Sequence, residues 1–235
     1  MKPSKPYYPL FLSLEGRVCL VVGGGRVGER KIRRILECGG EVRIVAKALT
    51  PWLELRKREK RVAHVDLRYG EEHLRGVDLV FAATSDNDLN RRVAEDARSR
   101  RLWCNMATDP ETGSFVVPSV LRRGPLAVAV STSGLSPALA RKIRESLEDR
   151  FGPEWKAYLE LMGRLRALVQ SKGLDTRENQ RLFREISGLS LLRHMEGMEE
   201  EGKDRVVEAV HRLAHPWVSK EELSLVWSET WKTCS

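Results

Sequence analysis

A glycine-rich turn directly after an apolar strand is the feature that most constrains the fold of this chain. Val18–Val22 is a continuous apolar run, as expected for a strand buried on both faces of a sheet. The residues at 23–28, Gly-Gly-Gly-Arg-Val-Gly, fit the pattern G-x-G-x-x-G, and apolar residues at helical spacing follow them. A strand, a tight glycine turn and a helix in this order are typical of the start of a dinucleotide-binding Rossmann fold.

Three glycines of this turn have defined mechanical parts in binding a pyrophosphate. Gly23 permits the tight turn, Gly25 lets the backbone approach the phosphates, and Gly28 lets the helix pack close to the strand. The free N–H groups and the positive dipole end of the following helix face the same turn. We therefore predict a cofactor site formed by Gly23, Gly24, Gly25, Arg26, Val27 and Gly28.

Strand-like and helix-like segments then alternate as far as about residue 105. An amphipathic segment at 89–97 has helical spacing, and four further strands are predicted at 42–46, 62–65, 77–83 and 102–104. This alternation predicts a parallel sheet with right-handed crossovers, so we assign the chain to the α/β class with a Rossmann-type sheet.

The pattern changes after Pro118. Residues 126–130 have the apolar character of one more strand, but from residue 154 onward the strand patterns vanish and apolar residues recur at helical spacing. Ser219 with Glu222 three residues later has the spacing of a capping box for a last helix. We divide the chain into three parts, residues 1–117, 118–152 and 153–235, the last of which is all helical.

The net charge of +8 is unevenly distributed. Residues 1–152 contain 28 Lys and Arg against 19 Asp and Glu, whereas residues 153–235 contain 13 against 14. Because a basic excess raises the local concentration of anions, it favours a nucleotide, a polycarboxylate or a nucleic acid as partner. A solvated basic surface without a partner is the alternative.

Localisation and metal binding are constrained by what the sequence lacks. The first 12 residues contain no apolar stretch of the secretory type, and no apolar run approaches the roughly 20 residues of a membrane-spanning helix. We therefore expect a cytoplasmic protein without a membrane partner. The four cysteines are widely spaced, and His211 and His215 have no carboxylate or cysteine at ligand spacing, so no metal site is predicted.

One element of the usual NAD site is missing. Many NAD enzymes have an Asp or Glu near the end of the second strand, where it binds the ribose hydroxyls, but this chain has Val-Ala-Lys-Ala at 45–48. Lys47 could accept a 2′-phosphate or could be a solvated loop lysine. The choice between NAD and NADP therefore stays open at this point.

Five blocks of sequence, in this order, resemble the dehydrogenase/ferrochelatase module of sirohaem synthase. They are VVGGGRVGERK at 21–31, FAAT at 81–84, NMATDP at 105–110, SFVVPS at 114–119 and AVSTSGLSPALAR at 129–141. The resemblance runs from about residue 10 to residue 147, and its separate blocks make it more specific than the glycine motif alone. Beyond residue 152 only the helical character is similar.

The resemblance implies a Rossmann domain, a short dimerisation segment at 118–152 and a helical C-terminal domain, assembled as a homodimer. It also implies NAD-dependent oxidation of precorrin-2, a polycarboxylate tetrapyrrole, to sirohydrochlorin, with transfer of a hydride to the nicotinamide and loss of a proton. Some members of the family then insert ferrous iron. An anionic substrate would match the basic excess of residues 1–152, and we expect no nucleic acid partner.

By position, the resemblance also implies where ligands bind. The cofactor would contact Lys47 and Ala48 after the second strand and Ala83 and Thr84 near the end of the fourth, and Asn105 would lie at the reaction site. Arginine side chains are candidates for binding the carboxylates of the substrate, because guanidinium groups suit carboxylates, and hydroxyl groups lie near them in sequence. The predicted substrate-binding residues are Arg122, Arg123, Ser131, Thr132, Ser133, Arg141 and Arg144.

The catalytic position departs from the family pattern. Where the family has an aspartate credited with proton transfer and chelation, this chain has Thr108, followed by Asp109. Threonine cannot act as a carboxylate base, and Asp109 would point to the opposite side of an extended backbone. Either a loop shift lets Asp109 serve, or the protein oxidises precorrin-2 without an efficient general base and leaves metal insertion to another enzyme. We favour the second interpretation, because hydride transfer mainly needs positioning whereas chelation needs a proton acceptor.

Two alternatives to this function are kept. One is a bifunctional dehydrogenase and sirohydrochlorin ferrochelatase. The other is a non-enzymatic NAD-sensing regulator whose basic face binds nucleic acid. That second alternative predicts a recognition helix rich in Arg, Asn and Gln, and the nearly neutral helical end of the chain does not offer one.

Overall fold

The computed structural model describes residues 6–106, 109, 112–195 and 201–234 and forms two compact units. The first unit contains Met1–Val117 and Thr132–Ser136, and the second contains Pro118–Ser131 and Pro137–Ser235. The two predicted parts after residue 117 thus fall mainly within one unit, and the three-part division of the chain stays a prediction.

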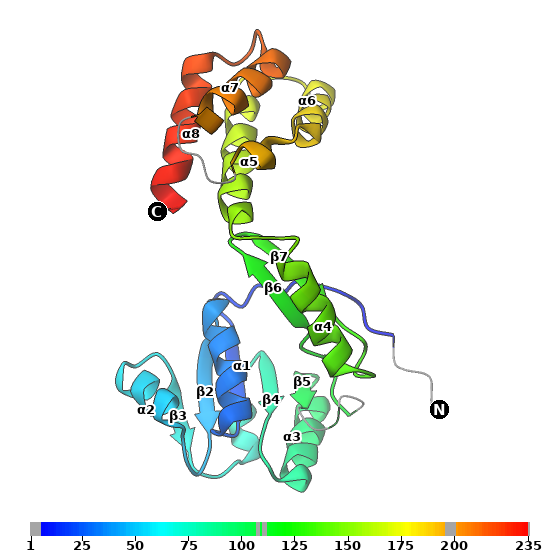
Figure 1. Cartoon of the computed structure of the whole chain (residues 1–235). Helices are drawn as coiled ribbons and strands as arrows, with labels where there is room; N and C mark the ends of the chain where they lie inside the picture. The colour runs from blue at the N-terminus through cyan, green and yellow to red at the C-terminus, as the bar shows by residue number, and fades with distance from the viewer. Residues whose placement is uncertain (1–5, 107–108, 110–111, 196–200, 235) are drawn as a thin grey trace. The chain divides into compact units, whose positions relative to one another are not determined.

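A five-stranded parallel sheet forms the first unit, as the alternating sequence pattern predicted (Figure 1). The strand order is β3-β2-β1-β4-β5, so β1 lies at the centre and the chain crosses to both sides of it. Every residue of β4 is buried, which explains its continuous apolar sequence. The strands are β1 (Val18–Val22), β2 (Glu41–Val45), β3 (Ala63–Asp66), β4 (Leu79–Ala82) and β5 (Trp103–Met106).

Helices cover both faces of this sheet. Ile32 and Leu53 from two of them pack with Val21 on one face, whereas Val93 from a third packs with Val22 on the other. Successive side chains of β1 therefore enter two different cores, as the pleat of a strand requires. The helices of this unit are α1 (Arg26–Glu37), α2 (Pro51–Arg58), the 3-10 helix η1 (Glu71–Leu74) and α3 (Asn87–Ser99).

The carboxyl edge of the sheet brings distant parts of the sequence into register. In the last row Val22 is paired with Ala82, which is paired with Met106. The row before it contains Val21, Phe81 and Asn105. The turns after β1, β2, β4 and β5 all leave the sheet at this edge, where open α/β sheets bind their ligands.

The second unit combines a β-hairpin with helices. Its two strands are antiparallel, with Ser119 opposite Val130, and the first of them was not predicted from the sequence. Buried apolar residues such as Leu161 and Trp227 form the core of the helical part. The predicted capping box is confirmed: the N–H of Ser219 donates to Glu222 at 3.0 Å, and the N–H of Glu222 donates to Ser219 Oγ at 3.2 Å. The elements are β6 (Ser119–Arg123), β7 (Leu126–Val130), α4 (Pro137–Glu148), α5 (Glu154–Gln170), α6 (Thr176–Gly188), the 3-10 helix η2 (Leu191–His194), α7 (Glu201–Ala214) and α8 (Lys220–Cys234).

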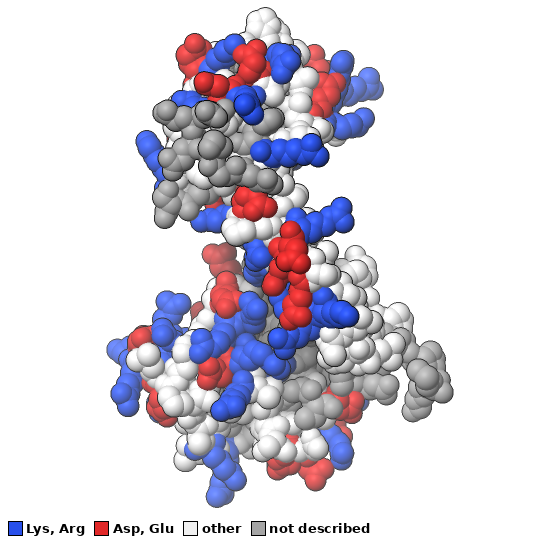
Figure 2. Space-filling model, in the orientation of Figure 1, with Lys and Arg blue, Asp and Glu red and all other residues white. Residues whose placement is uncertain are grey.

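Basic side chains gather over α1 on the surface of the first unit (Figure 2). The sequence of α1, RVGERKIRRILE, contains five Lys or Arg residues against two Glu. The basic excess of residues 1–152 therefore includes a concentration along the helix that follows the glycine turn. Among the helices of the described ranges, none is long and apolar enough to cross a membrane.

Candidate functional site

The turn between β1 and α1 has a backbone that glycine adopts far more readily than other residues. Gly23 has φ +121°, in the region that side chains with a Cβ rarely enter. A Cβ on Gly23 would lie 2.7 Å from the carbonyl carbon of Ala83, and a Cβ on Gly28 would collide with the carbonyl oxygen of Gly23. The turn is therefore packed tightly against both the end of β4 and the first turn of α1.

The other side of this turn is open. Gly25 is exposed, and a Cβ placed on it would have no described atom within 4 Å. Gly25 is also the N-cap of α1 and supplies no side-chain cap, and the first hydrogen bond of the helix runs from Glu29 N–H to the Gly25 carbonyl at 2.9 Å. The N–H groups of Arg26, Val27 and Gly28 consequently have no acceptor within the helix. A dinucleotide pyrophosphate fits this open site, because it supplies acceptors and negative charge.

The turn after β2 lies beside the glycine turn. The N–H of Thr50 donates to the Gly24 carbonyl at 3.1 Å, and Lys47 and Ala48 are exposed nearby in sequence. The nearby carboxylate of Glu29 accepts hydrogen bonds from the Thr50 hydroxyl and from Arg33. These bonds, the one from Thr50 most of all, hold the pKa of Glu29 below its usual range. Glu29 is thus tied to its own scaffold, and no carboxylate directly follows β2.

Asn90 fixes the turn after β4, and sequence reasoning missed it. The N–H and the hydroxyl of Thr84 donate to Asn90 Oδ1 at 3.1 and 2.8 Å, and Asn90 Nδ2 donates back to the Thr84 carbonyl at 3.0 Å. Asn90 is fully buried in α3. A polar residue within the apolar stripe that begins at Leu89 was the only signal in the sequence. These hydrogen bonds hold Ala83 and Thr84 against Gly23.

Asn105 lies in β5, one row before the carboxyl edge of the sheet. Both polar atoms of its side-chain amide form hydrogen bonds. Its Oδ1 accepts a hydrogen bond from Lys31 on α1, and its Nδ2 donates to the carbonyl of Phe115 at 2.9 Å. Lys31 was not predicted as a site residue. Burial, followed by repulsion from Arg30, lowers the pKa of Lys31 from its ordinary value to about 8.

The predicted catalytic pair is only partly described. Thr108 lies outside the described residues. Asp109 is described, and its two carboxylate oxygens accept hydrogen bonds from the backbone N–H and the hydroxyl of Thr112, at 3.4 and 2.5 Å. In this arrangement the carboxylate of Asp109 stabilises its own loop.

The predicted substrate-binding arginines lie in the second unit. Arg141 Nε donates to Glu145 at 2.7 Å, and Arg144 contacts both Glu145 and Glu148. Arg123 Nε donates to the carbonyl of Phe151 at 2.9 Å. Each guanidinium retains other N–H donors, so these bonds do not remove its capacity to bind a carboxylate.

The hydroxyl-rich segment before α4 has a local structural task. Thr132 Oγ1 accepts a hydrogen bond from the N–H of Ser136 at 3.0 Å, just before α4 begins. Ser133 has φ +53°, an unusual conformation for a residue other than glycine, Asn or Asp. Arg122, Ser131 and Ser133 remain predicted substrate contacts.

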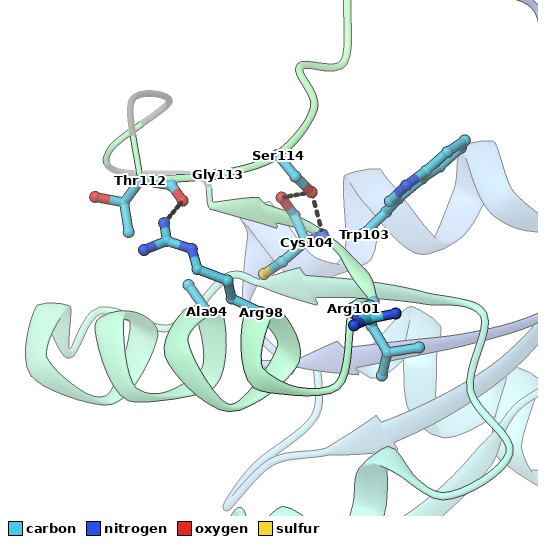
Figure 3. Close-up of a pocket in the computed structure, with 9 residues that line it drawn as sticks. Ala94, Arg98, Arg101, Trp103, Cys104, Thr112, Gly113 and Ser114 are labelled. Carbon is cyan, nitrogen blue, oxygen red and sulfur yellow. Dashed lines mark hydrogen bonds between the residues drawn. The ribbon is translucent and has the colours of Figure 1, made fainter.

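A pocket in the first unit lies away from the glycine turn (Figure 3). Arg98, Arg101 and Trp103 line it, together with the Cys104 and Ser114 segment at the outer edge of β5. Arg98 donates to the carbonyl of Thr112 at 3.0 Å. None of the predicted site residues lines this pocket.

A metal centre needs several ligand side chains close together. Among the residues that the structure describes, no group of three or more His, Cys, Asp and Glu side chains is placed to hold a metal ion. The rings of His211 and His215, the pair weighed from the sequence, lie edge to face with their centroids 5.4 Å apart, and Nδ1 of His211 lies 3.0 Å from the Val218 carbonyl oxygen.

Comparisons with known proteins agree with this geometry. Residues 10–119 match a family described as putative NAD(P)-binding, and residues 123–150 match one described as the sirohaem biosynthesis protein central domain. A sirohaem synthase of Neisseria meningitidis serogroup C / serotype 2a is 41% identical over 177 residues, which cover 75% of this chain and 37% of the relative. The solved structure of SirC, a precorrin-2 dehydrogenase, has a TM-score of 0.72 and 27% identity, covering 86% of this chain and 100% of SirC. The chain belongs to the family of sirohaem synthase and precorrin-2 dehydrogenase.

Membership of this family confirms the fold expected from the sequence. The segment 10–119 coincides closely with the first unit, so this unit is an NAD(P)-binding domain with a Rossmann-type sheet. A sirohaem synthase of Citrobacter koseri is 38% identical over 180 residues, which cover 77% of this chain and 39% of the relative. The chain therefore spans about two fifths of the length of the sirohaem synthases that it matches.

Proposed function

We propose that the chain is a precorrin-2 dehydrogenase that oxidises precorrin-2 to sirohydrochlorin with NAD. The observation that carries this proposal is the start of α1 at Gly25, which faces open space and has no side chain capping its N–H groups. The chain that carries it is similar to sirohaem synthases and to SirC. Precorrin-2 loses a hydride and a proton in this reaction, and NAD gains the hydride, so the electrons balance.

The residues of the chain act mainly by positioning. When bound, NAD supplies the electrophilic nicotinamide ring that accepts the hydride. The N–H groups of Arg26, Val27 and Gly28 would bind the pyrophosphate. The hydrogen bonds between Asn90 and Thr84 hold the turn after β4 beside this site. A general base is not needed for the hydride itself, which agrees with the absence of the family aspartate at Thr108.

For the cofactor we propose NAD, as the sequence resemblance implies, over NADP. The feature that favours NADP is the exposed Lys47 after β2, in the place where an acidic residue would favour NAD. A comparison of kcat/KM for the two cofactors at equal concentration tests this choice. A preference for NADP that is lost in Lys47→Ala would overturn it.

We further propose that the chain does not insert metal efficiently. The Asp109 carboxylate accepts two hydrogen bonds from Thr112, which supports a role in its loop over a role as the proton acceptor of chelation. The variant Asp109→Ala should therefore keep dehydrogenase activity, and Thr108→Asp, which restores the family residue, should gain chelation. Loss of all activity in Asp109→Ala would favour the bifunctional enzyme.

We also propose that the chain forms a homodimer through residues 118–152. In support, α4 exposes apolar side chains: Leu139 is 49% exposed and Ile143 is 38% exposed. Most residues of the strands β6 and β7 are half-buried. An apolar helix stripe of this kind is typical of a surface that is covered in an assembly. We propose a location in the cytoplasm, where thiols such as those of Cys19, Cys38 and Cys104 stay reduced.

One anaerobic assay separates the candidate functions. The protein is first given precorrin-2 with NAD, and then sirohydrochlorin with ferrous or cobaltous ion. Oxidation without metal insertion is the expected result. Both activities would indicate the bifunctional enzyme, and neither activity with NAD still bound would indicate the regulatory alternative.

A further inference from the structure

Glu29 directly follows the three residues whose N–H groups are proposed to bind the pyrophosphate. It lies in the first turn of α1, and its side chain is only 17% exposed. A carboxylate in this turn interacts favourably with the positive end of the helix dipole, but it repels an anion bound at the same end. Because the helix end is proposed to bind two phosphates, Glu29 opposes that binding unless it contributes in another way.

Both carboxylate oxygens of Glu29 are held by other parts of the protein. Oε1 accepts hydrogen bonds from Nε and Nη2 of Arg33 at 2.9 and 2.7 Å, and Oε2 accepts one from the hydroxyl of Thr50. Arg33 belongs to the next turn of α1, whereas Thr50 lies 21 residues away in the loop after β2. Glu29 therefore connects the start of α1 to this loop.

Thr50 is the point where the loop meets three other elements. Its N–H donates to the carbonyl of Gly24 in the glycine turn at 3.1 Å. Its Oγ1 accepts a hydrogen bond from the N–H of Leu53 at 3.3 Å, and so caps α2. A hydroxyl can donate one bond while it accepts another, so the bond to Glu29 adds α1 to the same junction.

Arg33 makes a second connection between the two helices. Its guanidinium carbon lies 3.9 Å from the centre of the Trp52 ring, a distance at which a cation is attracted to the ring face. Trp52 is in the first turn of α2 and packs against the core of the first unit. The bonds to Glu29 orient the guanidinium over this ring.

The loop held in this way lies directly on the glycine turn. A Cβ on Gly24 would lie 2.2 Å from the carbonyl oxygen of Ala48 and 2.8 Å from the side chain of Leu49. The sequence after β2 has no carboxylate at 46–50 to bind the ribose hydroxyls of a cofactor. Contacts on this side of the cofactor therefore depend on where the loop itself is placed.

We propose that Glu29 is a positioning residue for the adenosine half of the cofactor. Its hydrogen bonds to Thr50 and Arg33 hold the loop at 46–50 against the glycine turn, so that Lys47 and Ala48 lie where the adenosine ribose binds. Glu29 has no contact with the reacting atoms, and its effect passes through the loop. This inference rests on the part of the proposed function that places a dinucleotide at the glycine turn.

Four variants of the full chain test the proposal. Glu29→Ala removes both connections, and Thr50→Val removes the hydroxyl. Glu29→Gln removes the charge but keeps the connections, because its amide oxygen can accept from Arg33 and its NH2 group can donate to the Thr50 oxygen. Glu37→Ala is the matched control, since it removes a carboxylate that pairs with Arg34 in the last turn of the same helix.

Binding of ADP is the first readout, because ADP has the adenosine and the two phosphates but no nicotinamide. In calorimetric titration we expect the Kd to rise about tenfold in Glu29→Ala and Thr50→Val, and to stay within about twofold of the native value in Glu29→Gln and Glu37→Ala. The double variant Glu29→Ala/Thr50→Val should bind no more weakly than the weaker single variant, because the two side chains share one contact.

The opposite result has a clear signature. If Glu29 only repelled the phosphates, Glu29→Ala and Glu29→Gln would both bind ADP more tightly than the native chain, because both remove the charge. That result would overturn the proposal, and so would native affinity in Glu29→Ala.

Hydrogen exchange reports on the loop itself. The N–H of Thr50 should exchange faster in Glu29→Ala than in the native chain, and at the native rate in Glu29→Gln and Glu37→Ala. Equal exchange in Glu29→Ala and Glu37→Ala would refute the positioning role.

Steady-state kinetics with precorrin-2 connect the loop to the proposed reaction. KM for NAD should rise in Glu29→Ala while kcat changes by less than about twofold, because the lost contacts bind the cofactor equally before and during the reaction. If the native chain binds ADP but does not oxidise precorrin-2, the proposed reaction fails, and the binding and exchange data still decide the role of Glu29.

Discussion

Gly28 faces the carbonyl oxygen of Gly23 so closely that no side chain can stand between them. This contact joins the first turn of α1 to the end of β1, across the turn proposed to bind the pyrophosphate. The N–H groups at the start of the helix are held in place by it. The contact thus gives a physical reason for glycine at both positions of the motif.

Gly28→Ala should destabilise the first unit and weaken cofactor binding together. The new Cβ collides with backbone, which cannot move aside as a side-chain end could, and overpacking of this kind costs about 1–3 kcal/mol. Urea denaturation measures the loss of stability. A variant of native stability would contradict the packing described for this turn.

Gly25→Ala should separate binding from stability. Its Cβ enters open space, so the free energy of unfolding should hardly change, but the methyl group lies where the pyrophosphate is proposed to bind. We expect the Kd for NAD to rise about tenfold, equivalent to about 1.4 kcal/mol, in calorimetric titration.

The control for both glycine variants is Gly163→Ala in α5, where a Cβ also meets nothing. It should stabilise the chain by about 0.5–1 kcal/mol and leave NAD binding unchanged. If Gly25→Ala bound NAD as tightly as this control does, the pyrophosphate would have to lie elsewhere.

Lys31 should make stability depend on pH in the alkaline range. Its pKa is about 8 in the folded chain and near its ordinary value of 10.5 in the unfolded chain. Between these values the unfolded state binds more protons, so the contribution of Lys31 to stability rises with pH. The difference in melting temperature between the native chain and Lys31→Met should shift in favour of the native chain from about pH 8 to pH 10. A difference that stays constant would show that Lys31 titrates normally.

Ile143→Glu should weaken the proposed homodimer. A carboxylate in the apolar stripe of α4 would be buried without a partner when two copies associate. Sedimentation equilibrium should detect monomers at concentrations where the native chain is dimeric. Leu225→Glu on α8 serves as control, because Leu225 is 60% exposed and lies outside residues 118–152. Equal behaviour of the two variants would argue against this surface.

The elements that the sequence predicted well are those fixed by local pattern. The central strand at Val18–Val22, the glycine turn and the capping box at Ser219 each depend on residues close together in the chain. The strand β6 was missed because its sequence, SVLRR, has little apolar character, and its pairing with β7 supplies what the pattern lacks.

The site residues that were missed depend on contacts that no local pattern contains. Lys31 and Asn105 are 74 residues apart, and only the sheet order brings α1 next to β5. Asn90 is closer to its partner, six residues from Thr84, but its role depends on its own burial in the first turn of α3, where the two residues that begin the helix are exposed. The ion pairs of Arg141 and Arg144 with glutamates four residues ahead were not predicted either, although their i,i+4 spacing is a local pattern.

The most direct test of the account is the stoichiometry of the proposed reaction. The native chain is mixed with precorrin-2 and NAD without oxygen or metal, and NADH and sirohydrochlorin are measured in the same sample. We predict that the two products appear in equal amounts and that Gly25→Ala slows both alike. Sirohydrochlorin forming without NADH, or neither product forming, would contradict the proposal that this chain passes a hydride from precorrin-2 to NAD.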